Sequence, residues 1–232
     1  MIKLENVGFR YEDMAMNFDL QVAKGELVGI IGPSGAGKST LLSLIAGFDL
    51  PVSGRISIAG ADMEGVAPDR RPVSMIFQDH NSFAHLDVWT NVAIGISPDL
   101  KLDPQQRERI DGALARVGLS DFKARKPTEL SGGERQRIAI ARALVRDKPV
   151  LLLDEPFTAL GPALRRDMLD LIREIQKERK LTVLMVTHQP EDAKYAASRI
   201  AFVQNGLIAH VLPTKQFFAA SGPAEISAYL RG

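Results

Sequence analysis

Hydrophobic and polar residues along the chain form two patterns that alternate. Short runs that are almost wholly apolar occupy residues 26–31, 73–77, 150–154 and 181–187. Such runs are typical of strands buried on both faces of a parallel sheet. Between these runs, apolar residues recur at helical spacing and predict helices, which we place at 38–46, 104–117 and 131–146 and from Pro162 onward. The alternation predicts an α/β fold with a mainly parallel core sheet.

Strict alternation of apolar and polar residues indicates a second, antiparallel set of strands. It occurs in the first 22 residues, with a slip of phase near Asn6, and again at 55–59. Apolar residues on both sides of Asn205-Gly206 predict a hairpin near the C-terminus. We expect a single domain over residues 1–232. Its core should comprise an antiparallel β part and the parallel sheet, from about 1–78 and 147–232, with an inserted helical subdomain at about 79–146.

Composition and charge disfavour several classes of protein. Lys and Arg number 29 against 28 Asp and Glu, and the net charge of +1 disfavours a general binder of nucleic acid. The chain has no cysteine, which excludes disulfides and Cys-ligated metal sites. No apolar stretch reaches the ~18–20 residues of a spanning helix, and the N-terminus carries charges too early for a signal peptide. We therefore expect a soluble chain in the cytosol.

The strongest chemical signal is a glycine-rich loop between the strand at 26–31 and the helix at 38–46. It matches G-x-x-x-x-G-K-[ST] and comprises Gly32, Pro33, Ser34, Gly35, Ala36, Gly37, Lys38 and Ser39, followed by Thr40. The glycines let successive N–H groups face phosphate oxygens, and the helix start adds a positive dipole end. Lys38 supplies a charge for the β- and γ-phosphates, and the Ser39 hydroxyl can bind Mg²⁺. A plain glycine-rich turn is the alternative, which the strand–loop–helix context disfavours.

Two carboxylates, Asp154 and Glu155, follow the apolar run that begins at Val150. In a protein with a phosphate loop, the first can hold Mg²⁺ and the second can polarise an attacking water. An acidic turn after a core strand is the alternative, and the upstream loop weakens it. The chain has no Asn-Lys-x-Asp motif for reading a guanine base, so a Ras-like GTPase is disfavoured.

A second anion site is predicted at the start of the helix at 131–146. Ser131 as N-cap with Glu134 three residues later forms a capping box, and Gly132 and Gly133 leave the backbone open to an anion. By itself this pattern specifies only a capped helix. Together with the phosphate loop and the two carboxylates, Leu130-Ser131-Gly132-Gly133-Glu134 resembles the signature of the ATP-binding-cassette (ABC) ATPases, a family of P-loop NTPases.

The resemblance covers nearly all of the chain and implies roles for single residues. Tyr11 matches the aromatic residue that stacks on adenine, and Gln78 matches the glutamine that touches Mg²⁺ and water. His188 matches the histidine that contacts the γ-phosphate. In the family, residues at the positions of Asp154 and Glu155 serve the metal and the attacking water. The alternatives are structural: a strand tyrosine, a polar residue that ends a strand, and an isolated histidine.

One segment departs from the family pattern. After Pro156 the family usually has Ser-Ala-Leu-Asp, whereas this chain has Thr158-Ala159-Leu160-Gly161. The carboxylate that Gly161 replaces normally helps to couple the two ATP sites of a dimer. The resemblance therefore implies an ordinary fold and ATP binding, but it leaves the coupling and the rate of hydrolysis open.

The resemblance also implies partners. In this family two chains enclose two ATP molecules head to tail, so we expect a second copy of this chain, ATP and Mg²⁺. The chain is most similar to ATPase subunits of bacterial thiamine importers at residues 70–78, 81–88 and 151–160, stretches shared in part with polyamine, iron and sulfate importers. Such subunits serve integral-membrane permeases, and indirectly a periplasmic solute-binding protein, from the cytoplasmic face of the inner membrane.

The resemblance also implies a contact region for the permease, and two other classes of function remain as alternatives. Residues 79–100 are where the family receives a coupling helix of the permease, and Phe83 and Trp89 are candidate contacts, with core packing as the alternative. ABC ATPases of DNA repair or the ribosome usually carry coiled-coil insertions or two cassettes, and the balanced charge gives them no support. A nucleotide-binding regulator with little turnover draws its only support from Gly161.

Overall fold

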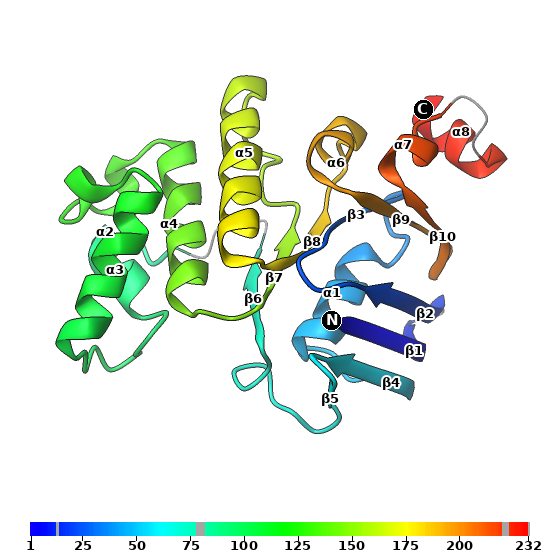
Figure 1. Ribbon diagram of the computed structural model, residues 1–232, viewed down its shortest axis with the longest axis horizontal. Helices are drawn as coiled ribbons and strands as arrows, with labels where there is room; N and C mark the ends of the chain where they lie inside the picture. The colour runs from blue at the N-terminus through cyan, green and yellow to red at the C-terminus, as the bar shows by residue number, and fades with distance from the viewer. Residues whose placement is uncertain (13, 78–81, 220–222, 232) are drawn as a thin grey trace.

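The strands of the computed structural model form one ten-stranded sheet in the order β5-β4-β1-β2-β10-β9-β3-β8-β7-β6 (Figure 1). The structure describes all residues except 13, 78–81, 220–222 and 232. The strands are β1 (Ile2–Tyr11), β2 (Met14–Val22), β3 (Leu27–Ile31), β4 (Ser53–Ile58), β5 (Ala61–Asp62), β6 (Val73–Ile76), β7 (Val150–Asp154), β8 (Thr182–Val186), β9 (Arg199–Gln204) and β10 (Leu207–Pro213).

The sheet has the two parts that the hydrophobic patterns predict. Strands β9, β3, β8, β7 and β6 pair in parallel, whereas β5, β4, β1 and β2 pair in antiparallel fashion. The slip of phase near Asn6 corresponds to a register shift between Leu4 and Val7, where Asn6 has a φ of 49°. The β9–β10 hairpin turns at Asn205-Gly206, with φ values of 50° and 75° that suit such a turn. The predicted fold class is confirmed.

Helices cover both faces of the core sheet and form a separate group at one end (Figure 1). They are α1 (Lys38–Ala46), α2 (Val88–Ala93), α3 (Pro104–Arg116), α4 (Gly132–Val145), α5 (Pro162–Arg179), α6 (Pro190–Ala196), α7 (Thr214–Phe217) and α8 (Ala224–Arg231), with 3-10 turns at Ser120–Phe122 and Pro127–Glu129. The α2, α3 and α4 helices pack on one another beyond α5, and the described residues 82–146 contain no strand. Within the described residues, none of the helices combines the length and the apolar character needed to cross a membrane.

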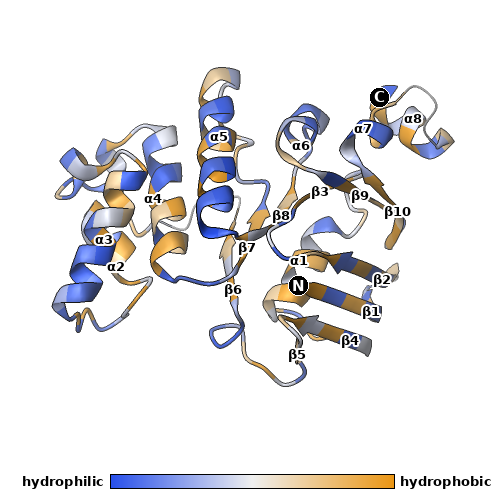
Figure 2. Ribbon diagram, viewed as in Figure 1, coloured by the Kyte–Doolittle hydropathy of each residue, from blue (hydrophilic) through white to orange (hydrophobic). Residues whose placement is uncertain are grey.

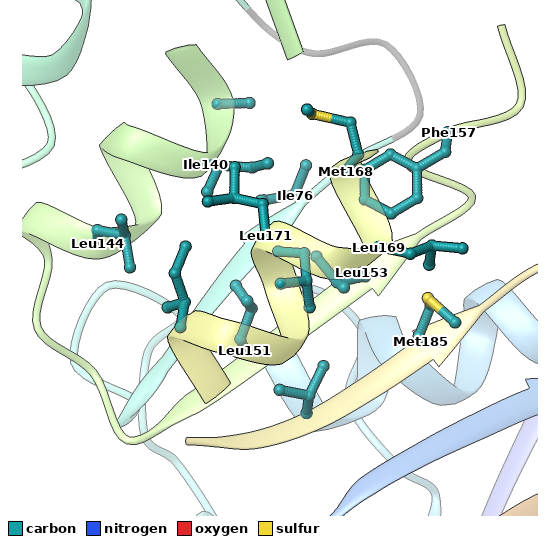
Figure 3. Close-up of a cluster of buried hydrophobic side chains, with 14 of the residues drawn as sticks. Ile76, Ile140, Leu144, Leu151, Leu153, Phe157, Met168, Leu169, Leu171 and Met185 are labelled. Atoms are coloured by element: carbon teal, nitrogen blue, oxygen red, sulfur yellow. The ribbon is translucent and has the colours of Figure 1, made fainter. Parts of the chain in front are cut away.

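The core consists of two apolar clusters, one on each face of the parallel strands. On β7, Val150 and Leu152 belong to the cluster around α1 and the antiparallel strands, whereas Leu151 and Leu153 belong to the cluster under α4 and α5 (Figure 3). Burial on both faces explains why the core strands appear in the sequence as continuous apolar runs. Beyond its first turn, α5 carries hydrophilic residues along its length, as Figure 2 shows.

A buried arginine closes the far end of α1, which the sequence did not reveal. Arg71 is 1% exposed, and its guanidinium donates hydrogen bonds to the carbonyl oxygens of Leu44, Ile45, Met63 and Val66. Two of these carbonyls belong to the last turn of α1, so the cation also lies at the negative end of the helix. Gly47 follows α1 in the left-handed conformation, and a Cβ there would lie 2.4 Å from Arg71 Nε.

Candidate functional site

The site lies where three neighbouring parallel strands end. Strand β3 leads into the glycine-rich loop, β7 ends at Asp154, and β8 lies between them, with Val186 paired to both Ile30 and Asp154. Parallel strands have their carboxyl ends at one edge of the sheet, so the loops that follow them converge. This topology brings together residues that are more than a hundred positions apart in the chain.

The first glycine of the loop passes so close to the sheet that a side chain cannot fit. Gly32 has a φ of 155°, and a Cβ there would lie 1.9 Å from the carbonyl oxygen of Val203 on β9. Gly37 precedes α1 with a φ of 101°, a conformation that an L side chain rarely adopts. The loop thus depends on glycine both for close approach and for its backbone angles.

Lys38 lies under the loop and is 4% exposed. Its ammonium donates hydrogen bonds to the carbonyl oxygens of Gly32 and Pro33, at 3.0 and 2.7 Å. Burial lowers the pKa of Lys38, and the neighbouring carboxylates Glu155 and Asp154 oppose that shift. The loop therefore encloses the Lys38 ammonium.

Ser39 and Asp154 form the next contact along the edge. The Ser39 hydroxyl donates to Asp154 Oδ1 at 3.0 Å. Burial is the main cause that raises the pKa of the Asp154 carboxyl, and the hydrogen bond from Ser39 partly offsets it. A hydroxyl and a carboxylate oxygen side by side form a pair of hard oxygen ligands, the type that Mg²⁺ prefers.

Glu155 and His188 face each other across the ends of β7 and β8. His188 Nε2 lies 2.5 Å from Glu155 Oε1. Glu155 itself has a φ of 47°, and its N–H donates to the carbonyl oxygen of Val186 at 3.1 Å. A non-glycine residue in this strained region is typical of functional sites, where the surrounding structure holds it in place.

A cavity of about 560 Å³ joins these groups. Its lining residues are Tyr11, Glu12, Met14, Met16, Ser34, Gly35, Gly37, Lys38, Ser39, Thr40, Glu155 and His188. Nine of the twelve were predicted from the sequence; the others are Glu12, Met14 and Met16. Their one available signal was the hairpin, because Met14 is the strand partner of Tyr11. Tyr11 is 61% exposed, so its ring is available to stack on a ligand.

Three residues of the loop do not line the cavity. Gly32 and Pro33 instead accept hydrogen bonds from Lys38. Ala36 is buried, and its carbonyl oxygen accepts a hydrogen bond from the N–H of Gly206 in the β9–β10 turn. These residues therefore contact the protein interior and hold the loop in its conformation. Gln78 lies outside the described residues.

The predicted second anion site, Ser131–Glu134, is not part of this cavity. The capping box is confirmed: Glu134 N–H donates to Ser131 Oγ at 3.3 Å, and Ser131 N–H donates to Glu134 Oε2 at 2.7 Å. Hydrogen bonds from Ser131 lower the pKa of Glu134. Gly133 also has a packing role that the sequence did not reveal, because a Cβ there would lie 2.4 Å from Leu164 of α5.

An α/β sheet with a glycine-rich loop of this form and paired carboxylates at its edge defines a P-loop protein. A family model described as ABC transporter matches residues 15–158. The thiamine import ATP-binding proteins ThiQ of Mesorhizobium japonicum and Aliivibrio fischeri are 53% and 48% identical to this chain. These matches cover 99% and 100% of this chain, and 90% and 99% of the relatives. The chain therefore belongs to the ABC transporter family.

Solved structures agree with this assignment. The dimeric structure of MJ0796, a bacterial ABC transporter cassette, matches with a TM-score of 0.80 and 30% identity over 92% of this chain and 99% of that chain. The ADP conformation of MJ1267, an ATP-binding cassette of an ABC transporter, matches in fold with a TM-score of 0.90 and 23% identity, over 100% of this chain and 98% of that chain. The fold is that of an ABC ATPase cassette.

Proposed function

We propose that this chain is the ATP-hydrolysing subunit of a bacterial ABC importer, and that the imported solute is thiamine. The observation that carries the proposal is the cavity at the strand ends, where Lys38, Ser39, Glu155 and His188 converge. The names of the relatives supply the solute, because thiamine import ATP-binding proteins from several bacteria are about half identical to the chain over nearly its whole length.

The volume of the cavity, about 560 Å³, and the Lys38 ammonium in its lining support ATP as the ligand. The loop N–H groups and the Lys38 ammonium would bind the phosphates, and the Tyr11 ring would stack on adenine. Ser39 and Asp154, whose oxygens lie 3.0 Å apart, would hold Mg²⁺. Bound there, the ion would neutralise charge on the phosphate oxygens. Gln78, which was also predicted for this site, lies outside the described residues.

Hydrolysis needs a base for water, and the position of Glu155 in the cavity lining supports this role for it. Its carboxylate would accept a proton from the attacking water, and His188 would donate a hydrogen bond to the γ-phosphate. In the structure the two side chains contact each other at 2.5 Å. We infer that ATP separates this pair, so that each group then faces the substrate.

The position of Ser131 supports a site that two chains complete together. Residues Ser131–Glu134 do not line the cavity of their own chain, and their capping box forms the start of α4. In a head-to-tail dimer, the α4 start of one copy would bind the ATP held by the other. The MJ0796 cassette, 30% identical, has been solved as a dimer. Residues 79–146 would form a helical subdomain that contains the Ser131–Glu134 site.

A permease would bind where the chain exposes apolar side chains. Phe48, Leu50 and Val52, between α1 and β4, are 56%, 67% and 73% exposed, and Phe83 is 46% exposed. Phe48 also packs against Phe77, at a ring distance of 5.6 Å. Trp89 is half-buried and its indole N–H donates to Asp111, so Phe83 is the better candidate contact of the two. The complex would lie at the cytoplasmic face of the inner membrane, with a periplasmic binding protein outside.

Uptake of labelled solutes tests the proposal. Cells that lack this chain should lose thiamine uptake, and the wild-type chain should restore it, whereas Lys38→Ala should not, because the buried charge for the phosphates is gone. Uptake of putrescine, iron and sulfate serves as the specificity control. Unchanged thiamine uptake in the deletion, with loss of one of the other solutes, would assign the chain to a different importer.

A further inference from the structure

Glu155 and His188 each lie in a short segment that leads from a strand into a helix. Residues 155–161 connect β7 to α5, and residues 187–189 connect β8 to α6. The side chains of His188 and Glu155 join the two segments directly, at a distance of 2.5 Å. Behind that pair, the first turns of α5 and α6 lie beside each other (Figure 1).

A second connection runs through Arg165 of α5 and Asp192 of α6. Arg165 Nη2 donates to the carbonyl oxygen of Leu160 at 3.0 Å, and Arg165 Nε lies 3.9 Å from Asp192 Oδ2. Asp192 Oδ2 also lies 3.5 Å from the hydroxyl of Thr187, which in turn accepts the N–H of Gln189 at 3.0 Å. These contacts reach the residues on both sides of His188.

The environment of the Arg165–Asp192 pair distinguishes it from an ordinary surface ion pair. The two side chains are 19% and 12% exposed, and burial raises the pKa of Asp192 although Arg165 opposes the shift. Solvent screens such a pair weakly. By contrast, the neighbouring pair of Glu191 and Lys194 on α6 has side chains 78% and 51% exposed.

We propose that Arg165 and Asp192 are positioning residues that set the spacing of Glu155 and His188. The Glu155–His188 contact joins the segments 155–161 and 187–189 directly, and the Arg165–Asp192 pair joins them through Leu160 and Thr187. We call this closed set of contacts the ring. When ATP separates Glu155 from His188, the Arg165–Asp192 pair would keep the two segments at a fixed position relative to each other. This inference rests on the proposed function for its effect on hydrolysis, but the ring itself is a property of the chain alone.

Hydrogen exchange of the chain without added nucleotide tests the ring independently of any assay of activity. Asp192→Asn should raise amide exchange in both 155–161 and 187–189, with the glycine-rich loop unchanged. Glu191→Gln is the matched control, because it removes a charge from the adjacent residue of the same helix, and it should leave both segments as they are. Unchanged exchange in both segments of Asp192→Asn would overturn the inference.

ATP turnover tests the consequence. Asp192→Asn and Arg165→Met should each lower kcat by about tenfold or more with KM for ATP within about twofold, since small displacements of reacting groups reduce rates strongly. The double variant leaves neither charge without its partner and should be no slower than the single variants. Asp192→Glu, which keeps the carboxylate, should have a kcat between those of Asp192→Asn and the wild type. A fall in kcat that matches the loss of folded protein, measured as the fraction of each variant that is folded in the assay, would overturn a positioning role.

The two readouts separate the possible failures. A wild-type chain without ATPase activity, combined with the predicted rise in exchange, would refute the proposed function and leave the ring supported. An active wild-type chain whose Arg165 and Asp192 variants keep both normal exchange and normal kcat would refute the ring alone.

Discussion

The Ser39 hydroxyl donates a hydrogen bond to Asp154 at 3.0 Å, which connects the first turn of α1 to the end of β7 across 115 positions of the sequence. Both residues were predicted as ligands of one Mg²⁺ ion from separate motifs. Their contact brings the glycine-rich loop and the carboxylates to one edge of the sheet. It also keeps Asp154 within the protein, where ionisation of the carboxyl is unfavourable.

Asp154→Asn should therefore raise the free energy of unfolding of the chain near pH 7 in the absence of nucleotide. Burial raises the folded-state pKa of Asp154 above its unfolded value. The ionised carboxylate then destabilises the fold above that raised pKa, and this penalty disappears as the pH falls through it. The advantage of the variant should shrink accordingly between neutral and acidic pH.

Urea unfolding of both chains at several pH values measures this advantage. Asp167→Asn, an exposed substitution on α5, serves as the control for loss of one negative charge. If the advantage of Asp154→Asn instead increased toward acidic pH, the carboxylate would be stabilising the fold, which is the opposite of the effect expected from its burial.

Gly32→Ala should destabilise the chain by about 3 kcal/mol or more, through a clash and an unfavourable backbone conformation. The added Cβ would lie 1.9 Å from the Val203 carbonyl oxygen, and backbone atoms of a core strand cannot move aside cheaply. Gly35→Ala is the matched control in the same loop, because a Cβ there meets nothing within 4 Å and only its φ of 73° is unfavourable. Thermal melting compares the two, and equal losses would show that close approach is not what requires glycine at 32.

Gly161→Asp should stabilise the chain by about 0.5–1 kcal/mol, from a better N-cap and from a negative charge at the start of α5. Gly161 has the extended conformation of an N-cap, makes no side-chain cap, and leaves open space for a Cβ. The family's aspartate would therefore fit at this position. Gly161→Ala, which cannot cap, should not gain stability. Equal melting temperatures for the Asp and Ala variants would show that capping is not available here.

Local features of the site could be predicted because short stretches of sequence specify them. The glycine-rich loop, the Ser131–Glu134 capping box and the Asn205-Gly206 turn each depend on residues that lie close together in the chain. The buried strands were predictable for a similar reason, since burial on both faces requires an apolar run. The comparisons confirm the family that these motifs together indicated.

Features that depend on packing between distant segments could not be predicted. Met16 lines the cavity because β2 passes beside the loop, where a Cβ on Gly37 would lie 3.0 Å from its sulfur. Arg71 looks like a surface residue in the sequence, but four carbonyl oxygens bind its guanidinium inside the fold. The facing positions of Arg165 and Asp192 likewise follow from the packing of α5 on α6, and no local pattern indicates them.

Turnover by Glu155→Gln tests the proposed hydrolysis most directly. The variant keeps the shape and a hydrogen-bonding side chain next to His188, and it removes the carboxylate that would accept the proton from water. We predict that Glu155→Gln binds ATP as tightly as the wild type, forms an ATP-dependent dimer in size-exclusion chromatography, and hydrolyses ATP at least about 100-fold more slowly. Near-normal turnover by this variant would contradict the role of Glu155 as the base.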